Sequence, residues 1–162
     1  MFNSELLPIY LNDHLAGATL GLDLAKRAAK ANEGTEFGDF LRDLAAELDA
    51  HRNQLEDVMA RLDVTRSHVK VGAGWLAEKV GRLKLNGRLL EYSPLSRMVE
   101  LEGLITGSNG RRGLWRSLAA AAPTEPRIAE IDFVDLVKRV DDDLEGLWAH
   151  HARAVEEMLA TR

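Results

Sequence analysis

Five polar residues of this chain fall where helical periodicity places apolar side chains: His14, Glu47, His51, Glu102 and His151. Burying such groups is costly unless they find partners, so each is expected to have a specific role. Imidazole and carboxylate groups together suit iron, zinc or manganese, and the same groups can also form a closed hydrogen-bonded network. These five residues are therefore the candidate site, either as metal ligands or as a structural cluster.

The turns of the chain place these residues in pairs. His14 and His51 lie at nearly equal distances along the chain from a turn expected near position 33, and Glu47 lies one helical turn before His51. Glu102 and His151 are related in the same way to a turn near position 127. We therefore expect each of two helical hairpins to hold its polar residues face to face. Whether the two sets share one height is left open.

Four long amphipathic helices account for most of the chain. Each begins at a first-turn proline or at a capping hydroxyl or carboxylate, which are the residues Pro8, Thr35, Ser93 and Asp132. The apolar residues that follow recur at helical spacing. We expect helices over residues 8–32, 35–62, 94–121 and from 132 to at least 158.

About thirty residues separate the second and third helices, which is too many for a tight turn. Within them, residues 68–85 have the pattern of a shorter helix that ends at Asn86-Gly87. The plan is a hairpin, a long helical crossover over about 63–92 and a second hairpin, in one domain covering 1–162. Four-helix bundles with one long crossover have this plan, and an up-down bundle with an extra helix laid across it is the alternative.

The third helix changes its apolar face part way along. Its apolar residues between 95 and 105 centre on one face, whereas Leu114, Trp115 and Leu118 centre on nearly the opposite one. The sequence Thr106–Gly110 lies between them. Either the helix breaks there or its second half packs against something else, and we expect a deviation, in its mildest form a kink at the Gly/Ser pair.

The chain resembles the ferritin-like superfamily, whose four-helix bundles have a long crossover and often hold two irons in the core. That family has a Glu on helices one and three and Glu-x-x-His on helices two and four. Glu102 matches the helix-three Glu, and His51 and His151 match the two histidines. Three positions depart from the pattern, because His14 replaces a Glu, Glu47 is one residue too far from His51, and Trp148 stands where the last Glu is expected. The resemblance implies a bundle of this shape more strongly than it implies a di-iron centre.

Other polar and aromatic residues are interpreted as structural. Trp75, Trp115 and Trp148 are expected in the core, whereas His150 and the run Asp141–Asp143 are expected on the solvated surface. No glycine-rich phosphate loop follows a strand, and no local signature supports a Ser/His/Asp triad. The sequence thus assigns no catalytic residue and no organic cofactor, and it leaves open whether the chain is an enzyme.

Composition sets further expectations. The 162 residues include no cysteine, no stretch resembles a signal peptide and no apolar run is long enough for a membrane span. We therefore expect a cytoplasmic protein. The high content of alanine and arginine suggests a bacterial source. The formal net charge is −5, with a basic middle between acidic ends. The basic segment 66–88 suggests an anionic partner, or else charges that pair within the fold. No motif favours nucleic acid, and a homo-oligomer is allowed.

Two functions remain as hypotheses. The first is a non-catalytic ferritin-like bundle with a structural or interaction role, in which the buried His/Glu cluster fixes the register of the helices. The alternative is a ferritin-like protein that binds Fe, Zn or Mn through the five candidate residues and is related to oxidoreductases. A hemerythrin-like site is a weaker third idea, because the inward histidines lack the spacing that such a site needs.

Overall fold

Long α-helices make up the bundle. The computed structural model describes residues 5–67 and 92–160, and no strand occurs among them. Two short 3-10 turns, η1 (Ala122–Thr124) and η2 (Pro126–Ile128), join the last two helices. The four helices are α1 (Leu6–Ala31), α2 (Glu36–Arg61), α4 (Pro94–Ala121) and α5 (Phe133–Ala160). The predicted all-α four-helix bundle is confirmed for this part of the chain.

Local sequence signals define where the helices begin. A side-chain oxygen caps three of them by accepting a hydrogen bond from a backbone N–H three residues later. The three caps are Thr35 with Gly38 (3.2 Å), Ser93 with Ser96 (3.2 Å) and Asp132 with Asp135 (2.9 Å). Gly34, with φ at 77°, makes the turn between α1 and α2 in a conformation that glycine adopts without strain.

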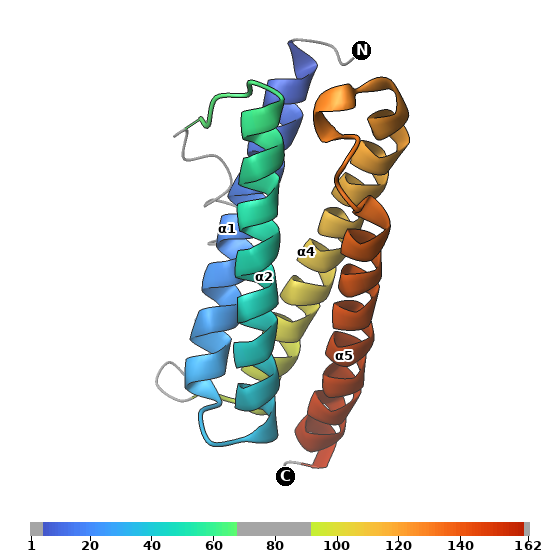
Figure 1. The fold of residues 1–162 in the computed structure, drawn as a ribbon. Helices are drawn as coiled ribbons and strands as arrows, with labels where there is room; N and C mark the ends of the chain where they lie inside the picture. The colour runs from blue at the N-terminus through green and yellow to red at the C-terminus, as the bar shows by residue number, and fades with distance from the viewer. Residues whose placement is uncertain (1–4, 68–91, 161–162) are drawn as a thin grey trace.

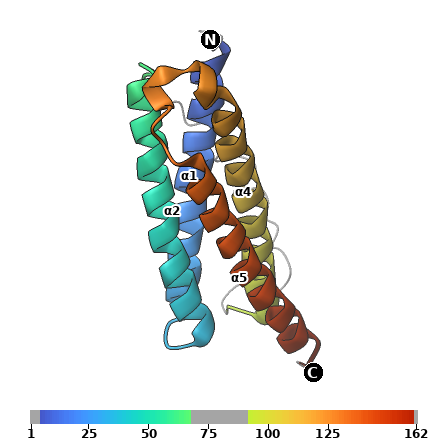
Figure 2. The same ribbon diagram turned by 45° about the vertical axis from the view of Figure 1, so that its right-hand side comes forward.

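The helices form two antiparallel hairpins, α1 with α2 and α4 with α5 (Figure 1). The hairpins meet mainly through α1 and α4, whereas α2 and α5 approach each other at fewer positions. The view in Figure 2 shows α5 diverging from α2 toward the C-terminus. The interior between the hairpins is therefore bounded chiefly by α1, α2 and α4.

Helices α2 and α4 run in the same direction, so the chain between them has to join opposite ends of the bundle. The Asn12 side chain, near the start of α1, donates to the carbonyl of Thr65 (3.1 Å) and accepts from the N–H of Ser67 (2.6 Å). Asn32, just past the end of α1, donates to the hydroxyl of Tyr92 (2.8 Å). This placement of both flanks agrees with the predicted long crossover. The helix predicted over 68–85 lies outside the described residues, as do Trp75 and nearly all of the basic segment.

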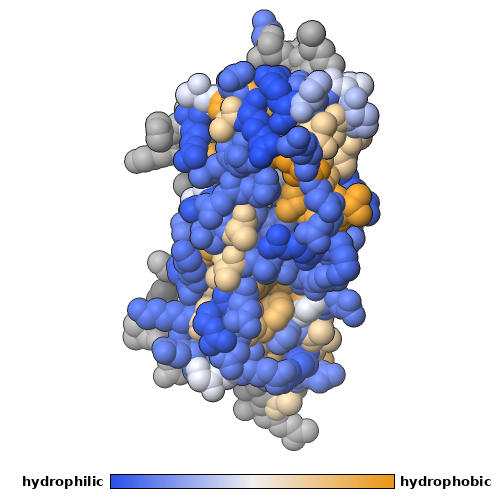
Figure 3. All heavy atoms as spheres, viewed as in Figure 1, coloured by the Kyte–Doolittle hydropathy of each residue, from blue (hydrophilic) through white to orange (hydrophobic). Residues whose placement is uncertain are grey.

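Apolar side chains from all four helices fill the core. Leu11, Val58, Trp115, Val140 and Leu147 are each 0% exposed. Hydrophilic residues cover most of the face drawn in Figure 3, and hydrophobic residues show there only in limited areas. Among the described residues, no helix combines the length and apolar character that crossing a membrane requires.

Of the two alternatives for the change of face in this helix, a break near Thr106–Gly110 is wrong, because α4 is one continuous helix. The hydroxyl of Thr106 donates to the carbonyl of Glu102 and the amide of Asn109 donates to that of Ile105, so polar side chains of this stretch bond within the helix. The buried face nevertheless rotates by roughly a quarter turn along α4. Its first half presents Leu101 and Leu104, and its second half presents Leu114, Trp115 and Leu118.

Candidate functional site

His51 is the most deeply buried of the five predicted site residues, at 2% exposed. The indole Nε1 of Trp115 donates to its Nδ1 at 2.9 Å. Burial, followed by the nearby charges of Arg111 and Arg139, lowers the pKa of His51 to about 3. The imidazole is therefore neutral, and because Nδ1 accepts, its proton lies on Nε2. Nε2 has no hydrogen-bond partner within the described part of the chain.

Glu47 lies one turn before His51 and is held by an arginine of α5. Its Oε2 accepts from Nη2 of Arg139 at 2.6 Å and from Nε at 3.1 Å. The charge of Arg139 also lowers the pKa of His51, so Arg139 lies near both residues. This agrees with the prediction that Glu47 and His51 lie on one side of α2. The partner of Glu47 is nevertheless a guanidinium and not the imidazole.

A second ion pair is more deeply buried. Nη2 of Arg111 lies 2.6 Å from Oδ2 of Asp143, and the two side chains are only 10% and 13% exposed. Burial lowers the pKa of Arg111 and raises that of Asp143, while the attraction between them opposes both shifts. The interpretation of Asp143 as solvated surface is therefore wrong. Its neighbours do point elsewhere, since Asp141 binds Arg112 and Asp142 binds Lys138.

Glu102 and His151 lie face to face, as predicted, with Oε1 of Glu102 3.3 Å from Nε2 of His151. The Glu102 side chain is 51% exposed, so the expectation that it points into the core is wrong. Leu101 and Leu104 occupy the buried face of α4 and leave Glu102 at its edge. Glu100 is the more enclosed carboxylate, because it accepts from the hydroxyl of Tyr92 at 2.7 Å and burial raises its pKa.

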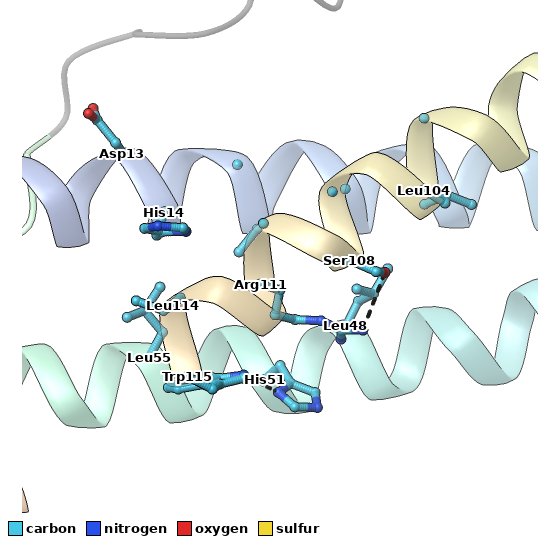
Figure 4. Close-up of a pocket in the computed structure, with 16 residues that line it drawn as sticks. Asp13, His14, Leu48, His51, Leu55, Leu104, Ser108, Arg111, Leu114 and Trp115 are labelled. Atoms are coloured by element: carbon cyan, nitrogen blue, oxygen red, sulfur yellow. Dashed lines mark hydrogen bonds between the residues drawn. The ribbon is translucent and has the colours of Figure 1, made fainter. Parts of the chain in front are cut away.

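His14 is half-buried on α1, where its ring stands edge-on to that of Tyr10 with 4.6 Å between centroids. Burial lowers its pKa, and the charge of Asp13 opposes that shift. His14 lines a cavity together with His51, and exposed residues such as Asp13 and Gly107 form part of its wall, so it opens to solvent (Figure 4). The two histidines predicted to lie face to face therefore line the same cavity from two helices.

The cavity has a volume of about 200 Å³ and lies between α1, α2 and α4. Figure 4 shows His14 on α1 above, Leu48, His51 and Leu55 on α2 below, and Arg111 reaching across from α4. Five glycines form much of the remaining wall, which is otherwise largely apolar. They are Gly17 and Gly21 of α1 and Gly103, Gly107 and Gly110 of α4. Each glycine in a helix interior costs up to about 1 kcal/mol relative to alanine, so such a concentration is unusual in stable helices.

The five predicted residues do not form one polar layer. His14 and His51 share the cavity, Glu47 is bound to Arg139, and Glu102 with His151 forms a separate pair near the surface. Within residues 5–67 and 92–160, no three His, Asp or Glu side chains are grouped closely enough to hold a metal ion.

Sequence reasoning overlooked Arg111, which is central to the site. Arg111 lies three residues after buried Ser108 and four before Trp115, so helical spacing alone places it on the buried face. Arg139, the partner of Glu47, lies one residue before buried Val140, and its reach across to α2 depends on how the two hairpins pack.

Two aromatic residues of α5 also differ from expectation. Trp148 is 53% exposed and not in the core, because Leu147 takes the inward position beside it. His150, expected on the wet surface, stacks on Phe40 with 3.9 Å between ring centroids, and Phe37 contacts it edge-on. One residue of helical rotation thus decides which side chain is covered.

Part of the basic middle of the chain is neutralised within the fold. Arginines of α4 bind acidic residues of α5 along the whole hairpin, in the pairs Arg97 with Glu157, Arg111 with Asp143 and Arg112 with Asp141. Comparisons of the chain with protein-family models, with curated proteins and with solved structures give no match.

Proposed function

We propose that this chain is a non-catalytic four-helix bundle of ferritin-like architecture, with a structural or interaction role, whose inward polar residues fix the register of the helices. Two parallel helices, α2 and α4, joined by one long connection support that architecture. The polar residues support the role, because their contacts link different helices. Trp115 bonds His51, and Arg139 bonds Glu47, so α2 is tied to both helices of the second hairpin.

The observation that carries this proposal is the double hydrogen bond from Arg139 to Glu47. Glu47 lies one helical turn before His51 on the same side of α2, so a metal bound by His51 would draw on it. A guanidinium already satisfies that carboxylate, and its positive charge repels a divalent cation. A pair of this kind, half-buried between α2 and α5, can instead favour one helical register.

A transition-metal protein remains the second candidate, and the Glu102–His151 pair is the observation that favours it. These side chains supply one oxygen and one nitrogen ligand within 3.3 Å of each other at the edge of the bundle. Iron, zinc or manganese accepts both ligand types, but needs further ligands beyond these two. An oxidoreductase activity would follow only from such an occupied centre.

Elemental analysis separates the two candidates. We expect protein purified without a metal-chelate column to contain far less than one Fe, Zn or Mn per chain. The variants His51→Leu and Glu102→Leu should leave that content unchanged. Stoichiometric metal in the native protein that is lost in both variants would contradict the structural proposal.

A double-mutant cycle tests the structural role directly. His51→Leu leaves the indole N–H of Trp115 buried without an acceptor, which should cost about 1–3 kcal/mol of unfolding free energy beyond any change in packing. Adding Trp115→Phe removes that stranded donor, so the double variant should be more stable than the sum of the two single losses predicts. Strict additivity in urea unfolding would show that the two side chains are not coupled.

A further inference from the structure

A groove between α1 and α4 forms the open side of the cavity. Figure 4 shows Asp13 on the outer side of α1, at the rim of the groove, and His14 turned inward. Gly103 of α4 marks the point where the two helices touch, because an added Cβ there would lie 3.2 Å from Leu24 of α1. Past this contact the two helices are bordered by exposed glycines, at which an added Cβ would meet no described atom within 4 Å: Gly17 of α1, and Gly107 and Gly110 of α4.

The chain leaves and re-enters the described structure at the two ends of this groove. At one end the Asn12 side chain bonds two backbone groups of residues 65–67, and the next residue of α1 belongs to the groove wall. At the other end the hydroxyl of Tyr92 donates to Glu100 at 2.7 Å, one turn before the contact between α1 and α4. Residues 68–91 therefore connect one end of the groove to the other.

The length of residues 68–91 fits a route along the groove. Asn12 and Asn32 hold the two flanks of this segment, and they are 20 positions apart, which is about 30 Å along α1. Residues 68–85 have the sequence pattern of a helix, and a helix of 18 residues spans about 27 Å. Such a helix laid along α1 reaches from one anchor to the other, and residues 86–91 complete the connection.

The composition of this segment matches the groove. The predicted helix gathers four apolar residues on one side, which are Val69, Leu76, Val80 and Leu83. Five basic residues against two acidic ones give the segment a net positive charge, and the groove has the carboxylate of Asp13 at its rim. Leu48 and Leu55 of α2 form its apolar floor (Figure 4). A cavity of about 150 Å³ admits benzene, so about 200 Å³ accepts an aliphatic side chain and keeps room for a methyl group.

We propose that residues 68–91 dock on this groove, with their apolar side against the glycines and their basic residues near Asp13. The glycines seat the segment, because without side chains of their own they let its backbone approach closely. Any other occupant competes with a segment tethered at both ends, whose effective concentration at the groove is about millimolar. This docking surface is separate from the structural role proposed for the ion pairs and holds whether or not a metal is present.

Single cysteines test the docking, because the native chain has none. Leu76→Cys and Val80→Cys place a thiol on the docked side of the segment, and Glu78→Cys places one on the opposite side. In the folded protein the first two should react with a maleimide at least tenfold more slowly than Glu78→Cys, and in urea all three should react at equal rates. Equal rates in the folded protein would overturn the proposal.

Groove-filling variants locate the docked segment. Gly17→Leu on α1 and Gly110→Leu on α4, each added to Leu76→Cys, should raise its maleimide rate at least tenfold, because the new side chain occupies the groove. Gly113→Leu makes the same change on α4 at a glycine outside the cavity wall and should leave the rate slow. Far-ultraviolet circular dichroism identifies the folded variants, and one of the two filling variants suffices.

Two further outcomes would overturn the proposal. An unchanged slow rate in a folded filling variant would place the segment elsewhere on the bundle. Protection of Leu76→Cys that disappears on dilution, together with a dimer in size-exclusion chromatography, would assign the groove to a second copy of the chain.

Discussion

Trp115 of α4 and His51 of α2 are joined by a hydrogen bond of 2.9 Å between the indole Nε1 and the imidazole Nδ1. Trp115 is 0% exposed and His51 is 2% exposed, so the bond lies wholly inside the bundle. An indole N–H can only donate, and this fixes which imidazole nitrogen keeps its proton. The contact links the two hairpins.

The first prediction concerns this bond. Trp115→Phe removes the indole donor and about a third of a large buried side chain, so it should lower the unfolding free energy by about 2 kcal/mol. Trp148→Phe is the matched control, because Trp148 is 53% exposed and a surface change usually costs less than about 0.5 kcal/mol. Urea unfolding followed by far-ultraviolet circular dichroism measures both. Equal losses in the two variants would refute the assigned burial.

The second prediction concerns pH. His51 has a pKa of about 3 in the folded protein, against 6.5 for the free side chain, so the unfolded chain binds more protons between these values. The contribution of His51 to stability is therefore complete above about pH 6.5 and is lost as the pH falls toward 3, at up to about 1.4 kcal/mol for each pH unit.

His51→Gln removes this titration and keeps a polar side chain that can accept from Trp115. The native protein should lose more stability than the variant between pH 6.5 and 4.5, as measured by urea unfolding at each pH. Glu100 and Asp143, whose pKa values burial raises, act in the opposite direction but are present in both proteins. Parallel stability curves for the two proteins would contradict a buried neutral His51.

The third prediction concerns the buried ion pair. Arg111→Met leaves the carboxylate of Asp143 enclosed without its partner, which should cost about 3–5 kcal/mol. Adding Asp143→Leu should recover much of that loss, because a whole buried pair can be replaced at little cost. Lys138→Met breaks an exposed pair with Asp142, whose side chains are 69% and 60% exposed, and should cost less than about 1 kcal/mol. Failure of the double variant to recover would show that Arg111 acts through packing.

The fourth prediction concerns the glycines. Gly107→Ala should stabilise the protein by up to about 1 kcal/mol, because Gly107 lies inside α4 at a negative φ and an added Cβ meets no described atom within 4 Å. Gly38→Ala should destabilise it, since its Cβ would lie 2.2 Å from the backbone oxygen of Asn32. Thermal unfolding of the two variants should therefore shift in opposite directions. A shift in the same direction would contradict the open space beside Gly107.

The starts of three helices could be predicted because they depend on local chemistry. Thr35, Ser93 and Asp132 cap helices in the structure as their side chains indicate in the sequence. The pairing of Glu102 with His151 could also be predicted, since it depends only on equal distances from one turn. These features involve neighbours along a helix or across a hairpin, where spacing in the sequence translates directly into spacing in the molecule.

The sequence by itself therefore determined the helices, their order and the pairing within each hairpin. Only the tertiary structure decided how the hairpins meet, and with it the partners of the polar residues. Arg139 reaches Glu47, and Arg111 lies near His51, because rotation of each helix about its axis is set by packing against the other hairpin. The same rotation covers His150, exposes Trp148 and leaves the glycines of α1 and α4 facing an open cavity.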